Sequence, residues 1–352
     1  MHVLKVIQTA DAPPSLVLGT YEGAWELWHW EPHARGADVG DWVCDACVPG
    51  AHAAPVTALG VLRDAQSLAA MDEALFVTGS SDATLQVWGR TASAAFAPQT
   101  ISLQGAYPLD VALVRLPVPT PVVLMAVALT DRRLMLYTRE GHGPFVKQLA
   151  LEGHEDWIRA LDAVVAPDPA RAGAPCVLLA SASQDQHIRL WKLQPDAPRT
   201  DAPRRDAFEA LASEILPDDA GLQTQSHALV LEHGRWAIAL DALLLGHDAW
   251  VTSVRWCPHD VDGAPRAALV SSSVDNSVIV WMPQSTSAWP TLADPAAAHA
   301  MWLPMHRLGD VGSLSGGFLG ALWRPGTAPA IAAHDRQGAW HLWCLTERQW
   351  VP

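Results

Sequence analysis

A short unit recurs along this chain, and it constrains the fold more than any other feature of the sequence. Each copy has small residues, then in most copies an Asp in a turn, then alternating apolar and polar residues that end in an aromatic residue. The six copies read EGAWELW, TGSSDATLQVW, ALTDRRLMLY, SASQDQHIRLW, SSSVDNSVIVW and HDRQGAWHLW, and they end at Trp28, Trp88, Tyr137, Trp191, Trp281 and Trp343. Successive ends are 60, 49, 54, 90 and 62 residues apart. We therefore expect a fold built from similar β-units, the longer spacings being filled by loop insertions.

Each unit is predicted to contain a β-hairpin. In DQHIRLW the alternation places Ile188 and Leu190 on one face of a half-buried strand. A Ser-rich strand, LLASAS or LVSSS, comes before it, and a tight turn at Asp185-Gln186 or Asp275-Asn276 joins the two. A Gly-His or similar pair and another strand lie upstream in AHAAPVTAL, EGHEDWIRAL and LGHDAWVTSVRW. These three strands, with a fourth beyond the aromatic residue, predict an antiparallel four-stranded sheet.

The Gly-His pairs and the Trp-ended strands resemble WD-repeat proteins over essentially the whole chain. The resemblance implies an all-β propeller over residues 1–352, with four-stranded blades, six visible blade ends and a seven-bladed ring as the family norm. It also implies that a buried His, Ser, Asp and Trp bond together in each blade, because a buried Asp needs hydrogen-bond donors. By position these residues are His154, Ser183, Asp185 and Trp191; His247, Ser273, Asp275 and Trp281; and, in a weaker copy, His52, Ser80, Asp82 and Trp88. The unit ending at Tyr137 has Asp131 but no Gly-His and no Trp, so we expect its cluster to be incomplete.

Among WD-repeat proteins, GHEDWIRAL, LLASASQDQHIRLWKL, LLGHDAWVTSVRW and LVSSSVDNSVIVWMP look like the first propeller of the Elongator subunit 2 family. A polar insertion, SHALVLEHGRWAIALDALLLGH and RLGDVGSLSGGFLGALWRPG agree with that resemblance, in the same order. The resemblance implies a non-catalytic scaffold of a complex that modifies wobble uridines in tRNA, in cytoplasm and nucleus. Its partners would be the largest Elongator subunit and the catalytic acetyltransferase-like subunit.

Two departures from that family lead to further expectations. The family has two seven-bladed propellers in tandem, so we expect this chain to be a truncated or short form whose open arc exposes strand edges. Because Trp28 comes early, we also expect the first unit to lack most of its upstream strands.

An insertion and an aromatic rim are the candidate contact surfaces. Residues 194–228 are rich in Pro, Asp and Arg, which predicts a loop; Phe208, Leu211 and Ile215 have helical spacing inside it. It is either a flexible insertion without a partner or a docking element for another subunit. Trp157 and Trp250 each stand at the entry to an inner strand and are candidates for core packing as well as for a contact. The candidate partner-binding residues are Asp156, Trp157, Arg159 and Trp250.

Composition disfavours several classes of function. A net charge of −14 argues against strong direct nucleic-acid binding, and the densest basic run, Arg199 to Arg205, is interrupted by Asp201. Five dispersed cysteines indicate a reducing compartment. The N-terminus lacks the apolar core of a secretory signal, and the longest apolar run, Val122 to Leu129, is too short for a bilayer. We expect a soluble intracellular protein without a membrane partner.

Reactive residues are present without a convincing catalytic or metal motif. Cys44 and Cys47 with nearby His52 suggest zinc, but a single CxxC pair is not a site, so we expect no metal and no cofactor. His247, Ser273 and Asp275 suggest a hydrolase triad, yet the same set recurs one unit earlier, which favours a structural role. We therefore expect a protein that is not an enzyme. A WD-repeat substrate adaptor, such as those of ubiquitin ligases, is the alternative, and a propeller hydrolase is the third hypothesis.

Overall fold

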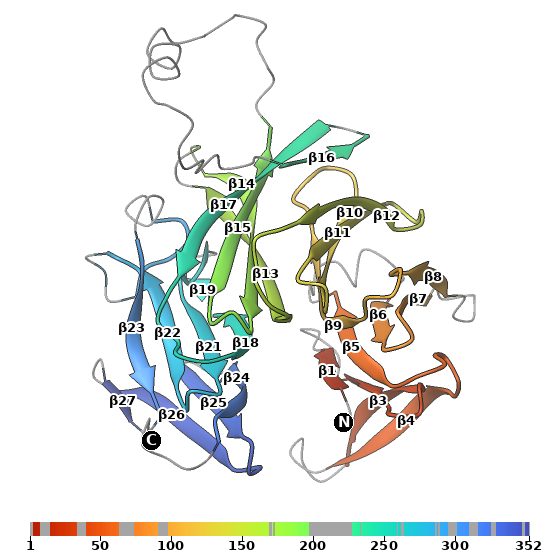
Figure 1. Ribbon diagram of the computed structural model, residues 1–352, viewed down its shortest axis with the longest axis horizontal. Coiled ribbons are helices and arrows are strands. Elements are labelled where there is room, and N and C mark those ends of the chain that lie inside the picture. Colours follow the sequence, from red (N-terminus) through yellow and green to blue (C-terminus); the bar gives the residue numbers. More distant parts are fainter. Residues whose placement is uncertain are drawn as a thin grey trace, which may run out of the picture.

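Six antiparallel β-sheets are arranged around a common centre, one for each repeat unit (Figure 1). The computed structural model describes residues 3–7, 15–33, 40–62, 74–90, 98–168, 171, 173–196, 227–232, 234–258, 260–261, 264–285, 287, 289–294, 301–309, 316–324, 329–346 and 349–351. The prediction of an all-β propeller of antiparallel blades is confirmed. The described residues contain no helix that is long and apolar enough to cross a membrane.

The sheets are called blades 1 to 6 in chain order, and in each the first strand is the innermost. Blade 1 consists of β1 (Val3–Ile7), β2 (Ser15–Gly19), β3 (Trp25–Pro32) and β4 (Gly40–Val48). Blade 2 consists of β5 (Val56–Val61), β6 (Ala74–Ser80), β7 (Thr84–Arg90) and β8 (Gln99–Ser102). Blade 3 consists of β9 (Pro108–Arg115), β10 (Val122–Leu129), β11 (Leu134–Glu140) and β12 (Val146–Leu151).

Blade 4 has five strands, because a hairpin follows its third one. They are β13 (Ile158–Asp168), β14 (Ala174–Ser183), β15 (Ile188–Pro195), β17 (Gly234–Leu244) and, outermost, β16 (His227–Leu231). Blade 5 consists of β18 (Val251–Trp256), β21 (Leu269–Ser273), β22 (Val278–Pro283) and β23 (Trp302–Leu308), with a small ribbon of β19 (Asp260–Val261) and β20 (Ala264–Pro265). Blade 6 consists of β24 (Phe318–Arg324), β25 (Ala330–Asp335), β26 (Trp340–Thr346) and β27 (Gln349–Val351).

The structure corrects one sequence expectation and leaves another outside its range. Blade 1 has four strands, so the expectation that this unit lacks most of its upstream strands is wrong; two strands of five residues each, β1 and β2, precede β3. The predicted insertion at 194–228 begins in β15 and ends in β16. Its centre, residues 197–226 with the candidate helix, lies outside the described residues.

In the units that carry it, the Asp shapes the turn between the second and third strands. In blades 2 to 5 its carboxylate accepts the backbone N–H two residues ahead, as when Ser277 N donates to Asp275 Oδ1 over 2.9 Å. The residue between them takes a left-handed conformation, with φ of 64° at Ala83, 70° at Arg132, 74° at Gln186 and 63° at Asn276. An Asp side chain stabilises such turns by this bond, which explains why the residue recurs.

Five hydrophobic clusters form the core, one at each junction between consecutive blades. Alternation along a strand sends neighbouring side chains to opposite faces, so an inner blade must bury both faces. All eight residues of β10 and all six of β22 are accordingly buried. Blades 1 and 6 each belong to one cluster only, and they face each other across the side of the arc where both termini lie (Figure 1).

Candidate functional site

The predicted His, Asp and Trp of blade 5 lie together in a chain of buried hydrogen bonds. Trp281 Nε1 donates to Ser271 Oγ over 2.8 Å. His247 Nε2 is 2.7 Å from the same oxygen, and its Nδ1 is 3.0 Å from Asp275 Oδ2. The set is satisfied when Ser271 donates to Nε2 and Nδ1–H donates to the carboxylate, which requires a neutral imidazole.

Blades 2 and 4 repeat this arrangement. In blade 4, Trp191 donates to Ser181 over 3.0 Å, and His154 lies 2.8 Å from Ser181 and 2.7 Å from Asp185. In blade 2, Trp88 donates to Thr78 over 2.9 Å, while His52 Nε2 lies 2.7 Å from that hydroxyl and Nδ1 lies 3.4 Å from Asp82. Three copies of one geometry tie the Gly-His loop, the second strand and the third strand of each blade.

In each of these hydrogen-bonded clusters, the hydroxyl that bonds to the His and the Trp is not the predicted one. Ser183, Ser273 and Ser80 were expected, but Ser181, Ser271 and Thr78 hold these places, two residues earlier on the same strand. The reason is reach: the indole lies beside the residue ten positions before it, and the later serine stands at the strand end. There Ser183 donates to Asp156 O and accepts from Asp185 N, and Ser273 and Ser80 do the same in their blades.

These bonds set the charges of the clusters. Burial alone would raise the pKa of Asp185, but the bond and charge of His154 and two backbone amides outweigh it and lower the pKa to about 2. The pKa values of Asp275 and Asp82 are lowered against the same opposing effect of burial. Burial lowers the pKa values of His154 and His52. At neutral pH each of these carboxylates is therefore charged, and His154 and His52 are neutral.

The Ser–His–Asp order resembles a catalytic triad in connectivity but not in access. Ser271 is fully buried, and its oxygen already bonds both to His247 and to the indole of Trp281. A nucleophilic serine must meet its substrate, so this hydroxyl would have to leave the core of the blade to react. The proposed triad residue Ser273 does not contact His247 through its hydroxyl but donates to Ala249 O.

A second polar system, which the sequence interpretation missed, lines the centre of the propeller. Asp110 Oδ2 of blade 3 accepts the Leu161 amide of blade 4, and Asp162 Oδ2 accepts the Trp256 amide of blade 5. Ser253 Oγ then accepts the Ala321 amide of blade 6. The inner strands of blades 3 to 6 are thereby bonded each to the next. The available signal was an Asp inside an apolar strand, in PLDVALV and RALDAVV.

Asp110 also links blades that are not neighbours. Lys5 Nζ of blade 1 donates to Asp110 Oδ1 over 3.2 Å, and Arg255 Nη1 of blade 5 lies 3.7 Å from Oδ2. Burial would raise the pKa of Asp110, but these cations and the Leu161 amide lower it. The inner strands of blades 1, 3 and 5 therefore meet at one buried carboxylate.

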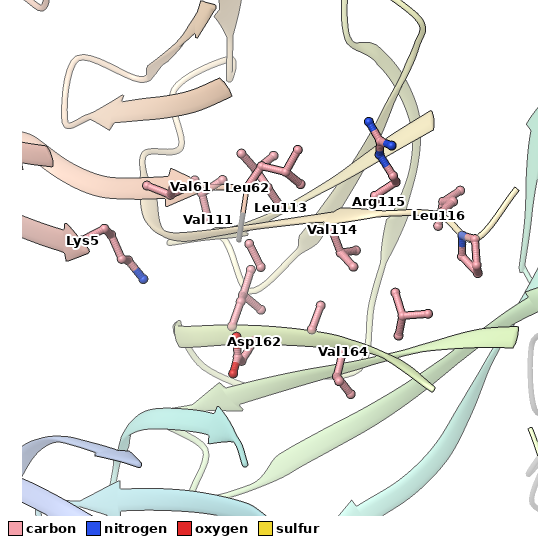
Figure 2. Close-up of a pocket in the computed structure, with 15 residues that line it drawn as sticks. Lys5, Val61, Leu62, Val111, Leu113, Val114, Arg115, Leu116, Asp162 and Val164 are labelled. Atoms are coloured by element: carbon pink, nitrogen blue, oxygen red, sulfur yellow. The ribbon is translucent and has the colours of Figure 1, made fainter. Parts of the chain in front are cut away.

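A cavity of about 390 Å³ lies beside this cluster, between β5, β9 and β13. Figure 2 shows Lys5 at one end of the lining and Arg115 at the other, with Val111, Leu113 and Val164 between them. Its walls are mainly apolar. Of its three charged residues, Lys5 and Asp162 hold the bonds described above, whereas Nε and Nη2 of Arg115 are buried without a hydrogen-bond partner among the described residues. The lining of the cavity therefore defines an apolar space and not a pair of side chains arranged for catalysis.

The candidate partner-binding residues lie at the entries to β13 and β18. Trp157 is 38% exposed and Trp250 is 46% exposed, so both belong to the surface rather than to the core. Trp157 meets Tyr107 edge to face at 6.4 Å. Asp156 and Arg159 are half-buried, and burial, together with the charge of the nearby Arg336, lowers the pKa of Arg159.

Cys44 and Cys47 lie on β4, the outer strand of blade 1, and both are exposed. The pKa of the Cys44 thiol is raised, first by the partial loss of water around it and then by the charges of Glu26 and Cys47. His52, the third residue of the zinc hypothesis, is committed to Thr78, Thr84 and Asp82 in blade 2. Within the described ranges, no three His, Cys, Asp or Glu side chains gather in a way that could hold a metal ion.

Comparison with known proteins agrees with this architecture. The family "WD domain, G-beta repeat" matches residues 143–192 and 240–282, which span much of blade 4 and most of blade 5. The sheets, the repeated clusters and this match define the chain as a WD-repeat β-propeller protein.

Within that class, the chain is similar to Elongator complex protein 2. It is 31% identical over 314 residues to the protein of Danio rerio, covering 88% of this chain and 33% of that protein. It is 29% identical over 359 residues to the protein of Mus musculus (100% and 38%) and 28% identical over 254 residues to that of Schizosaccharomyces pombe (69% and 28%). The resemblance inferred from the sequence is confirmed. The chain spans roughly a third of the length of these relatives.

Proposed function

We propose that this chain is a non-catalytic scaffold subunit of an Elongator-like complex, required for modification of wobble uridines in tRNA. Its partners would be the largest Elongator subunit and the catalytic acetyltransferase-like subunit, and it would work in cytoplasm and nucleus. The observation that carries the proposal is similarity to Elongator complex protein 2 over 69% to 100% of the chain, in animals and in a yeast.

The non-catalytic part of the proposal is supported by burial. The three Ser- or Thr-His-Asp clusters are all in the blade interior, and one geometry repeated three times fits a role in stability. The scaffold part is supported by the exposed Trp157 and Trp250, because Trp is enriched where partners bind most tightly. Partner-binding roles for these two, with Asp156 and Arg159, belong to the same proposal.

Affinity purification of the tagged chain from its own cells, followed by mass spectrometry, tests the assignment. We expect to recover the largest and the catalytic Elongator subunits. Recovery of ubiquitin-ligase subunits in their place would overturn the proposal in favour of the adaptor hypothesis.

A double variant, Trp157→Ala with Trp250→Ala, tests the rim. We expect at least a tenfold loss of one of these subunits with an unchanged melting temperature. Tyr21→Ala is the matched control, since Tyr21 is a 66% exposed aromatic residue at another turn. Equal recovery with both variants would remove the rim from the proposal.

A further inference from the structure

The inner strands of blades 2 to 6 begin at the same end of the central channel. In blade 2, Thr57 is the second residue of β5, and its hydroxyl donates to Pro108 O at the start of β9 over 2.6 Å. In blade 5, the hydroxyl of Thr252 donates in the same way to Phe318 O at the start of β24 over 2.8 Å. The bonds from β9 to β13 and from β13 to β18 run in the same sense. We call the end that holds these first residues the mouth of the channel.

A β-bulge stands at the start of each of these five strands. Pairing with the second strand of the blade skips one residue in each, namely Thr57, Leu109, Arg159, Thr252 and Leu319. A bulge aims its extra side chain out of the regular alternation, and bulges are common beside functional sites. Among these five residues, Arg159 alone is charged.

Arg159 does not do what the threonines at its position do. Thr57 and Thr252 join their blade to the next one, whereas no hydrogen bond or ion pair connects the half-buried guanidinium of Arg159 to a described residue. Arg336, which lies in the turn between β25 and β26, is exposed, and its guanidinium also has no such partner among the described residues. A partly buried cation without a counter-charge is costly for a fold, so its retention points to a ligand.

The two arginines lie within electrostatic range of each other. Burial lowers the pKa of Arg159 and so does the charge of Arg336, while the hydroxyl of Tyr107 opposes them. No carboxylate of a described residue contributes to this balance. Two guanidinium groups that share a site without an acid stabilise an anion placed between them.

Three aromatic residues, Tyr107, Trp157 and Trp250, extend from this pair across blades 3, 4 and 5. Each immediately precedes its inner strand, and its carbonyl accepts a backbone N–H from the turn between the second and third strands of its blade, over 3.2, 2.9 and 3.1 Å. In blade 6 the N–H of Arg336 makes the same bond to Gly317 O over 3.1 Å, so Arg336 also stands beside the mouth. The aromatic residues and the arginines therefore belong to one surface.

The charges decide which ligand this surface fits. Exposed tryptophans alone would suit a cation, because aromatic faces attract positive charge. Arg159 and Arg336 repel a cation and select an anion. Nucleic acid also combines phosphates with bases that stack on aromatic rings, but a net charge of −14 opposes a phosphate backbone. A carboxylate on a polypeptide meets both requirements.

We propose that the mouth binds an acidic segment of a protein partner, with one Asp or Glu carboxylate held between Arg159 and Arg336. Apolar or aromatic side chains beside that carboxylate would pack on Tyr107, Trp157 and Trp250. A guanidinium matches a carboxylate in shape as well as in charge, and Trp is a residue type on which binding energy concentrates. This partner chemistry rests on the rim assignment made under the proposed function and adds the class of segment that the rim selects.

Selection from a phage library of random short peptides, with the purified full chain as bait, tests the proposal. Peptides that also bind the chain with Arg159→Thr are removed by counter-selection. We expect the remaining sequences to share an Asp or Glu next to an aromatic or large apolar residue. Sequences without a common acidic position, or no enrichment at all, would overturn the proposal.

Arg159→Thr separates binding from folding, because Thr holds the same bulge in blades 2 and 5. We expect at least tenfold weaker binding of a fluorescein-labelled selected peptide, measured by fluorescence anisotropy, with an unchanged melting temperature. Arg324→Glu is the control, since Arg324 is exposed and ends β24 at the opposite end of the channel. Undiminished binding by the Thr variant, or an equal loss in the control, would contradict the site. If the Thr variant melts early, the peptide with Gln in place of its acid should show the same tenfold loss on the unaltered chain.

Charge reversal gives a readout that a structural role for Arg159 would not produce. Arg159→Glu should lose the acidic peptide and regain binding when Lys replaces the acid in that peptide. Failure of this rescue would count against direct contact and overturn the proposal. A labelled oligouridine should not bind the mouth; binding that Arg159→Thr abolishes would replace the acidic segment by a nucleic acid.

These outcomes are separate from those of the affinity purification. A chain that recovers Elongator subunits but binds no acidic peptide would retain the proposed function and lose this site. A chain that binds acidic peptides but recovers ubiquitin-ligase subunits would retain the site and lose the proposed function.

Discussion

Blades 3 and 5 solve the same packing problem with opposite chemistry. In blade 5, Trp281 bonds to Ser271, ten residues before it, and the chain continues to His247 and Asp275. In blade 3, Tyr137 takes the place of the Trp, and ten residues before it stands Val127, which is completely buried. Asp131 of blade 3 remains in its turn but pairs with Arg133 at the surface.

The difference teaches that the buried hydroxyl, the His and the Trp are kept together in blade 5 and lost together in blade 3. A buried network with one partner missing leaves donors unsatisfied, and this costs more than an apolar core of similar shape. Without a Trp and a Gly-His, blade 3 therefore has aliphatic residues throughout the interior of β10. Either solution stabilises a blade, but a mixture should not.

Ser271→Val, which gives blade 5 the blade 3 residue at one position only, should have the largest effect. It leaves both His247 Nε2 and Trp281 Nε1 without a partner, at about 1–3 kcal/mol each. We expect a loss of about 3 kcal/mol in the free energy of unfolding, measured by urea denaturation. A conservative Val127→Ile change at the matching position of blade 3 should cost far less. Similar losses for both would contradict the all-or-none interpretation.

His247→Ala should cost somewhat less, about 2 kcal/mol, because Asp275 keeps its bonds to Ser277 and to the Asp248 amide. A lowered melting temperature in thermal denaturation is the expected result. An unchanged melting curve would argue against the buried cluster.

Acid should weaken the blades that contain the cluster before it weakens blade 3. Because burial lowers the pKa values of His52 and His154 below 6.5, the folded state disfavours their protonation. Their contribution is complete well above pH 6.5 and is lost as the pH falls below it. The contribution of Asp82, Asp185 and Asp275 is complete above 3.8 and is lost only at lower pH. Melting temperatures should therefore decline between pH 7.5 and 5, with hydrogen exchange in β10 affected last; a flat profile would contradict this.

Asp131→Ala in blade 3 should have the smallest effect, below about 0.5 kcal/mol, because its ion pair with Arg133 is partly exposed. Asp275→Ala in blade 5 is the matched change and should cost several times more. Thermal denaturation of the two variants in parallel separates the turn bond, which both lose, from the buried network, which only one has. Equal shifts would show that the turn alone matters.

The repeat predicted the blades well because alternation and turn chemistry are local. Six aromatic ends gave six sheets, and the His, Asp and Trp of three clusters lie as their positions implied. The hydroxyl was misassigned to Ser183 and Ser273 because two serines on the same strand face lie within two residues of each other. Only their distance from the indole distinguishes them.

What the sequence could not predict depends on contacts between blades. Asp110 and Lys5 are 105 residues apart, and nothing in either segment indicates the other. The 67% exposure of Trp340 could not be foreseen either. Apolar and polar residues alternate along its strand as they do along a buried strand. Burial of a blade face is decided by its neighbour, not by its own residues.

The contact between Lys5 and Asp110 gives the chain an order of assembly. Lys5 leaves the ribosome first, yet its counter-charge is synthesised 105 residues later, and Arg255 follows only after the whole of blade 4. Contacts so distant in sequence form late, because the intervening chain must be ordered first. β1 should consequently be among the last strands to settle in a newly made molecule, and nascent chains that stop short of blade 3 should leave it open to proteases.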